Sequence, residues 1–127
     1  MKKIPLFLLF IFCSNRCAPE ATIIHFFNKS EKNVILLSKS ELQDYRNRFL
    51  SKTLVSVRTI KNNDDRYLGF VTNELDNFKN NDGNYFFYIV NSIDVDSIVV
   101  KKNRIKLLQE NNTIIYNPKE ILFLNKE

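Results

Sequence analysis

The sequence predicts a single small α+β domain, mainly an antiparallel β-sheet with one amphipathic helix packed on it. Three observations predict this class. The chain has 127 residues, enough for one domain. Several short runs are apolar or alternate between apolar and polar residues, as strands do, and one segment combines helical periodicity with capping signals. With 44% hydrophobic and 26% charged residues, the composition is that of a globular protein.

The N-terminal segment differs from the rest of the chain. Lys2 and Lys3 precede an apolar run over residues 4–12, the pattern of a secretory signal peptide. The run is too short to cross a bilayer, which takes about 20 apolar residues. A buried core helix is the alternative, and Pro5 disfavours it. We therefore expect residues 1–12 to be a signal peptide.

Both cysteines of the chain follow this run. Cys13 stands directly after it, an arrangement that resembles the export signal of bacterial lipoproteins, in which such a cysteine is lipidated and becomes the first mature residue. Cys17 is the alternative lipidation site, and a Cys13–Cys17 disulfide is a third option. Residues 13–21 then form the lipidated cysteine and a tether, and residues 22–127 form the α+β domain.

The first elements of the domain are predicted to be a hairpin and a helix. Residues 22–27 and 33–37 are apolar runs joined by a polar connection, which favours two paired strands. The helix is expected over residues 41–51, where a capping box is offered by Ser40 with Gln43 or by Ser38 with Glu41. Its apolar stripe, expected to pack on the sheet, consists of Leu42, Tyr45, Phe49 and Leu50.

A second hairpin is predicted from residues 53–60 and 67–72. Val55 and Val57 alternate with Leu54, Ser56 and Arg58 in the first of these runs, the period of a strand. In residues 73–81, Leu75 and Phe78 are compatible with one helical turn or with a loop anchored on the core. The sequence favours neither of these two interpretations.

Residues 84–91 are the predicted centre of the sheet. Six consecutive aromatic or β-branched residues follow the turn signal Asp82-Gly83. Because both alternating faces of this run are apolar, we expect a central strand covered on both sides. Further strands are predicted over residues 98–102, 105–108 and 113–116. Residues 121–124 suit either a helix begun at Asn117 and Pro118 or a last strand.

The net charge of the chain gives no support for nucleic-acid binding. The net charge of +5 falls to 17 − 14 = +3 once Lys2 and Lys3 are removed, which is too small to indicate nucleic-acid binding. The densest basic run is predicted to be an extended strand, and the favoured interpretation is a solvated strand that protects the edge of a sheet. The alternative is that the strand presents a patch to an anionic partner. The run consists of Lys101, Lys102, Arg104 and Lys106.

No pattern typical of catalysis or metal binding occurs in the sequence. His25 is the only histidine and lies in an apolar run, which favours a packing role. Asn80, Asp82 and Gly83 suit a turn better than a calcium loop, and Asp94 and Asp96 are expected to be solvated flanks of a turn. Nucleophile elbows, phosphate-binding loops and zinc motifs are absent from the sequence. We therefore expect no enzyme, no cofactor and no metal.

These observations predict a small exported protein, anchored by lipid in the bacterial cell envelope, that acts as a binding or assembly module. Its expected partners are the membrane, through the N-terminal lipid, and a protein of the envelope. The alternative is a periplasmic or secreted inhibitor or immunity-type protein that inserts a loop into an enzyme. Residues 73–84 are the candidate loop.

Overall fold

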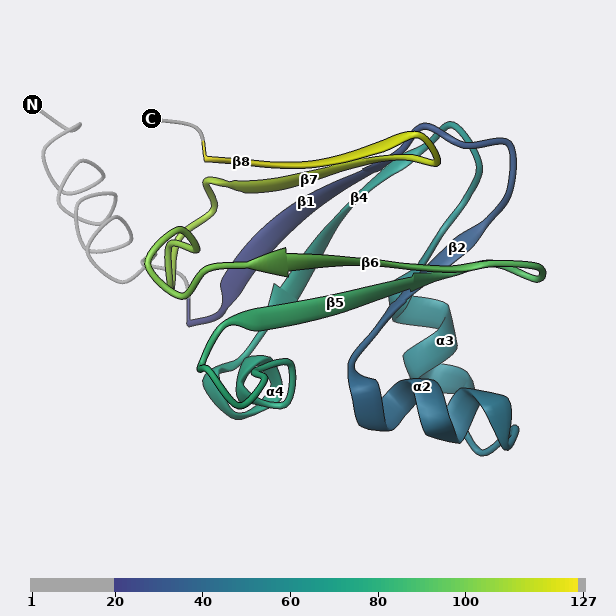
Figure 1. Ribbon diagram of the computed structural model, residues 1–127, viewed down its shortest axis with the longest axis horizontal. Helices are drawn as coiled ribbons and strands as arrows, with labels where there is room; N and C mark the ends of the chain where they lie inside the picture. Colours follow the sequence, from purple (N-terminus) through teal and green to yellow (C-terminus); the bar gives the residue numbers. More distant parts are fainter. Residues whose placement is uncertain (1–19, 126–127) are drawn as a thin grey trace, which may run out of the picture.

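In the computed structural model, residues 20–125 are described and form two four-stranded sheets and three short helices (Figure 1). The first sheet has the strand order β4-β1-β7-β8, and the second has the order β3-β2-β5-β6. The strands are β1 (Thr22–Asn28), β2 (Val34–Leu37), β3 (Thr59–Ile60), β4 (Asp65–Phe70), β5 (Tyr85–Val90), β6 (Val95–Val100), β7 (Asn112–Asn117) and β8 (Glu120–Asn125). The helices are α2 (Lys39–Arg46), α3 (Lys52–Arg58) and α4 (Thr72–Asp76).

The predicted class is confirmed in its coarse form, a mixed α+β fold made mostly of sheet. The finer expectation of one sheet with one helix is wrong, since residues 20–125 contain two sheets and three helices. Neighbouring strands are antiparallel except for β1 and β7, which run parallel. The predicted signal peptide and the lipidation site at Cys13 lie outside the described residues. Within residues 20–125, no helix has the length and apolarity to cross a membrane.

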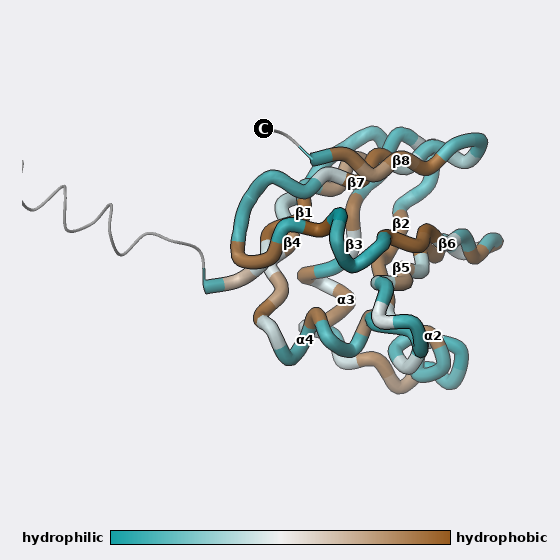
Figure 2. Tube along the Cα trace, turned by 60° about the vertical axis from the view of Figure 1, so that its left-hand side comes forward, coloured by the Kyte–Doolittle hydropathy of each residue, from teal (hydrophilic) through white to brown (hydrophobic). Residues whose placement is uncertain are grey.

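The main core lies between the two sheets. Alternate residues of β1, β4 and β7 in the first sheet and of β2 and β5 in the second are buried in one cluster. Phe26 and Phe87 represent the two sides, and each is 0% exposed. A smaller cluster lies on the other face of the second sheet, where Leu42 and Leu54 of the helices pack on Leu37 and Val90. The second sheet therefore has helices on its outer face, and the first sheet has none among the described residues (Figure 2).

Neither predicted hairpin forms. The strands β1 and β2 exist but belong to different sheets, because β1 pairs with β4 and β7 whereas β2 pairs with β3 and β5. The polar connection between them is held by Asn28, whose amide donates to the carbonyls of Lys32 and Ile60 at 2.8 and 3.0 Å. The chain thus crosses from one sheet to the other where a local turn was expected.

The predicted helix is present as α2 but is shorter than expected. Its capping box uses Ser38 and Glu41, the second of the two candidates. The helix ends at Arg46, and Arg48 follows in the left-handed region with φ 64°. Of the expected stripe, Leu42 is buried and Leu50 packs against it, but Phe49 is 78% exposed because it lies beyond the last turn.

The strand predicted over residues 53–60 is wrong, because most of it is helix α3. Ser51 caps this helix by accepting from the backbone of Leu54 at 3.1 Å. In a helix, Leu54 and Arg58 are four residues apart and share one face. That face points inward, while Val55 and Val57 are 38% and 47% exposed. The alternation of apolar and polar residues in this segment therefore does not correspond to alternating burial.

The central position of β5 is confirmed, since it pairs with β2 on one side and β6 on the other. Its inward residues Tyr85, Phe87 and Ile89 are buried in the main core. The expectation that both faces are covered holds only in part, because Phe86 and Tyr88 on the outward face are half-buried.

The C-terminal part contains three strands. The strands β6 and β7 correspond to predicted runs, and β8 decides the open alternative at residues 121–124 in favour of a strand. The strand expected over residues 105–108 is wrong. That segment is a loop, in which Ile105 is buried and Leu108 has a φ of 56°.

Tyr116 of β7 links the two sheets through a hydrogen bond. Its hydroxyl donates to the carboxylate of Asp96 on β6, and the side chain is 1% exposed. Burial, followed by the hydrogen bond to Asp96, raises the pKa of Tyr116 well above its usual value of 10.0. The expectation that Asp96 is simply a solvated turn residue is wrong, because it is half-buried and accepts this bond.

We expect Tyr116→Phe to lower the free energy of unfolding at pH 7 by about 1–3 kcal/mol, because it leaves Asp96 without its donor. In the wild type, the folded state keeps the phenol proton while the unfolded state loses it above about pH 10. The wild type therefore loses stability as the pH rises past that value, and its advantage over the variant narrows. Urea denaturation of both proteins between pH 7 and 11 measures this difference.

Tyr67→Phe is the matched control, because Tyr67 is 65% exposed. Its difference from the wild type should stay small at every pH. A gap between the wild type and Tyr116→Phe that is unchanged up to pH 11 would contradict the raised pKa.

Candidate functional site

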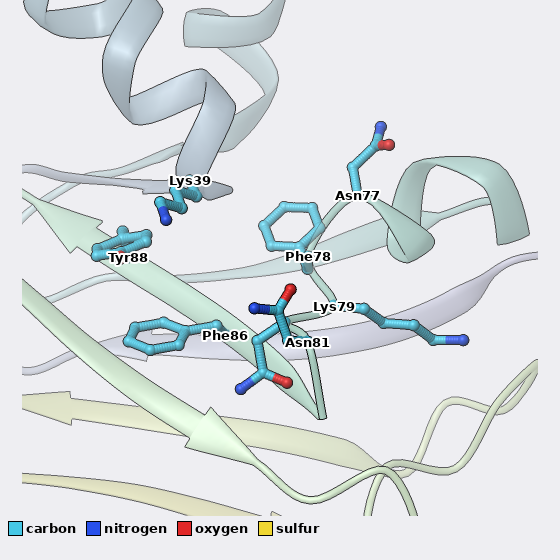
Figure 3. Close-up of a pocket in the computed structure, with 8 residues that line it drawn as sticks. Lys39, Asn77, Phe78, Lys79, Asn81, Phe86 and Tyr88 are labelled. Carbon is cyan, nitrogen blue, oxygen red and sulfur yellow. The ribbon is translucent and has the colours of Figure 1, made fainter. Parts of the chain in front are cut away.

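A groove of about 240 Å³ lies on the outer face of the second sheet. One wall is the start of α2, and the other is the segment that follows α4 (Figure 3). The lining residues are Lys39, Asn77, Phe78, Lys79, Asn80, Asn81, Phe86 and Tyr88. Its volume is somewhat below that typical of sites for drug-sized ligands, about 300–1,000 Å³, and suits a single small group or side chain.

The floor of the groove exists because the helices cover only one end of β5. Val90 is buried under Leu42 and Leu54, whereas Phe86, four residues earlier on the same face, is half-buried and belongs to neither core cluster. Phe86 and Tyr88 stack on each other, with ring centroids 4.9 Å apart and an angle of 21° between the rings. The groove therefore has a half-buried aromatic floor.

The second wall is a rigid turn. Phe78 is 1% exposed, and its carbonyl accepts from the backbone of Phe86 at 2.7 Å. The side chain of Asn80 accepts from the backbones of Asp82 and Asn84, each at 3.0 Å, and Gly83 has a φ of 82°. The predicted turn at these residues is therefore present, and it fixes the position of the groove wall.

Polar groups without partners line the rim. The ammonium of Lys39 and the side-chain amides of Asn77 and Asn81 make no hydrogen bond or ion pair with any residue in the range 20–125. Figure 3 shows Lys39 near Tyr88 and Asn81 near Phe86. Lys79 instead points away from these rings and pairs with Asp76 at 3.3 Å. The groove thus offers one cation and two amides beside apolar rings, and its lining contains no carboxylate.

The buried Arg58 links the elements that form both walls. Its guanidinium donates to Glu41 of α2 at 2.8 Å and to Glu74 of α4 at 2.9 Å. The same group lies 4.9 Å from the ring centroid of Phe70 and 5.1 Å from that of Phe78. Because Arg58 is 3% exposed, both ion pairs are shielded from solvent at the arginine. The groove wall and the main core are therefore joined through one side chain.

The basic run is not the strand that the sequence predicts. Lys101, Lys102, Arg104 and Lys106 lie in the turns between β6 and β7, so they share no extended face. Arg104 donates to the carbonyl of Phe123 at 2.8 Å and lies over its ring, on the edge strand β8. Lys106 is half-buried, and its backbone donates to Asn112. This geometry favours a partly structural role, with Arg104 covering an exposed sheet edge.

His25 lies outside the groove, on β1 of the first sheet. Its Nε2 is 2.5 Å from the carboxylate of Asp65, and its ring stacks on Tyr67 with the centroids 4.0 Å apart. The packing role predicted for His25 agrees with these contacts. Within the described residues, no group of three or more histidine, cysteine, aspartate or glutamate side chains could hold a metal ion.

Comparisons with models of known protein families, with curated proteins and with solved structures found no match for this chain. The candidate site therefore rests on its geometry.

Sequence reasoning singled out residues 73–84, one wall of the groove, but missed Lys39, Phe86 and Tyr88. A signal for the two aromatics was present, because both alternating faces of residues 84–91 are apolar while the sequence predicts one short helix to cover the sheet. Lys39 had no such signal, because its place beside Tyr88 depends on where α2 packs.

Proposed function

We propose that this protein is a small exported module, lipid-anchored at Cys13 in the bacterial cell envelope, that binds a partner protein through the groove. The observation that carries the binding role is the combination of an unpaired Lys39, two unpaired amides and a half-buried aromatic floor. Aromatic residues that keep one open side are typical anchors of protein interfaces. Because the lining holds a cation and no carboxylate, the preferred partner group is an apolar side chain next to an acidic one.

If Cys13 carries the lipid anchor, a palmitate analogue should label the full chain in bacterial cells. Cys13→Ser should remove the label, and Cys17→Ser should keep it, because the apolar run ends directly before Cys13. Gel fluorescence after click labelling measures the result. Label that survives in Cys13→Ser but is lost in Cys17→Ser would assign the lipid to Cys17 instead.

If the groove binds a partner protein, a photo-reactive group placed in the groove should crosslink that partner. A photo-reactive amino acid in place of Asn81 in the full chain should crosslink a protein of the envelope. The same probe in place of Glu110, an exposed loop residue away from the groove, is the matched control. Lys39→Gln should weaken the Asn81 crosslink several-fold without loss of stability, since Lys39 is exposed and unpaired. Equal crosslinking from both positions would rule out the groove as the recognition site.

The identity of the crosslinked protein also distinguishes the proposed binding module from the alternative, an inhibitor of an enzyme. The proposed loop, residues 73–84, begins with α4 and is held by the buried Leu75 and Phe78. Its tip at Asn81 and Asp82 is exposed, as are the side chains of Asn73, Asp76, Asn77 and Lys79. A stoichiometric partner enzyme that loses activity in the complex would favour the inhibitor. A multiprotein envelope complex without such an enzyme would favour the binding or assembly module.

A further inference from the structure

The outer face of the first sheet is apolar and has no covering layer among the described residues. The strand register brings outward residues of four strands into neighbouring rows: Tyr67 lies beside His25, and Phe27 lies beside Ile115. Leu122 and Leu124 of β8 complete these rows. Tyr67, Leu124 and Leu122 are 65%, 45% and 39% exposed. We define the outer face by Ile23, Phe27, Tyr67, Ile115, Leu122 and Leu124.

The ionisable side chains on this face are few, and they lie at its margin or pair with each other. His25 and Asp65 pair with each other, and the His25 ring is covered by Phe27 and Tyr67, with centroids 4.2 and 4.0 Å away. Glu120 lies at the β7–β8 turn, at the end of the face. A contiguous apolar surface of this kind marks an interaction site on a soluble protein.

The proposed lipid anchor lies close in sequence to the first strand of this sheet. Eight residues, 14–21, separate Cys13 from Thr22, the first residue of β1. Fully extended, they span no more than about 30 Å. At the same end of the sheet, the backbone of Leu108 donates to Thr22 at 2.9 Å, and Leu107 and Leu108 are 52% and 48% exposed. Two exposed leucines thus lie beside Thr22, where the domain begins.

We propose that this outer face lies against the lipid bilayer that holds the Cys13 anchor, an inference that rests on the proposed lipidation. The short tether keeps the face at a high local concentration next to the membrane, so even weak insertion is populated. Tyrosine with leucine and isoleucine is a composition that the membrane interface favours. Docked in this way, the domain turns its second sheet and the groove away from the bilayer, toward a partner.

The test uses the full lipidated chain carrying Cys17→Ser, reconstituted into vesicles of phosphatidylethanolamine and phosphatidylglycerol. A polarity-sensitive fluorophore is attached at Leu124→Cys. The matched control is Ile93→Cys in the β5–β6 turn of the other sheet, where Ile93 is 69% exposed. Nitroxide-labelled lipids should quench the Leu124 probe at least about two-fold more than the Ile93 probe. Leu122→Asp, at an exposed position, should reduce this difference.

Three results would overturn the inference. Equal quenching at both positions would mean that the face does not meet lipid. A Leu124 probe that is shielded but not quenched, with shielding lost on diluting the protein in the vesicles, would show that a second copy covers the face. Absence of palmitate label at Cys13 would remove the anchor itself, and only that result would also contradict the proposed function.

Discussion

Arg58→Ala should lower the free energy of unfolding by about 3–5 kcal/mol, the cost of breaking a buried ion-pair network by removing one partner. The substitution deletes two charge-assisted hydrogen bonds, to Glu41 and Glu74. It also empties the space between the rings of Phe70 and Phe78. Urea denaturation followed by circular dichroism measures the loss.

Two variants test the reason for this effect. Arg46→Ala, on the exposed last turn of α2, is the matched control and should change stability by less than about 0.5 kcal/mol. Arg58→Lys keeps the charge but cannot reach two carboxylates at once, so it should recover only part of the loss. A cost below about 1 kcal/mol for Arg58→Ala would mean that the network contributes little.

The same network connects stability to the candidate site. Glu41 accepts from Arg58 and also closes the capping box of α2, through its bond to the backbone of Ser38 at 2.9 Å. Lys39, at the rim of the groove, belongs to that same first turn. Loss of Arg58 should therefore disturb the groove as well as the core.

Phe87→Ala should also cost about 3–5 kcal/mol, as expected for truncating a fully buried aromatic residue. Phe87 is 0% exposed on the central strand β5, and its ring centroid lies 5.1 Å from that of Phe78. The cavity would open between the two sheets, where strands on both sides are held by pairing and cannot easily close it. Equilibrium denaturation in urea is again the measurement.

Phe49→Ala provides the control for Phe87, because Phe49 is 78% exposed. It removes the same side chain and should cost less than about 0.5 kcal/mol. If Phe87→Ala cost less than about 1 kcal/mol, the assignment of β5 to the centre of the core would be wrong.

The residues that form the candidate site come from separated parts of the chain, which limits what sequence can predict about it. The turn around Gly83 was predictable, since its signals are local. The aromatic floor belongs to an apolar run that the sequence shows clearly. However, the sequence predicted that the outward residues of this run, Phe86 and Tyr88, would be covered by another layer. Phe86 remains half open because α2 begins at the groove, at Lys39, and its buried Leu42 packs on Leu37 and Val90 at the other end of β5.

Arg58 illustrates a second limit. Residues 53–60 alternate in the sequence, and two β-branched residues favour a strand. The helix forms because it places Leu54 and Arg58 on one inward face, where the arginine finds two carboxylates and two aromatic rings. The contacts that Arg58 makes with residues distant in sequence outweigh the local preference for a strand, which is worth less than about 1 kcal/mol per residue.

The sequence by itself determined the α+β class, the central strand β5, the capped start of α2 and the turn at Gly83. Each of these depends on the spacing of apolar residues or on hydrogen bonds within a few positions. Only the tertiary structure decided that β1 and β2 belong to different sheets, that residues 52–58 are helical and that the basic run is a loop. Strand partners are chosen by which pairing buries the most apolar surface across the whole chain, and no local pattern records that choice.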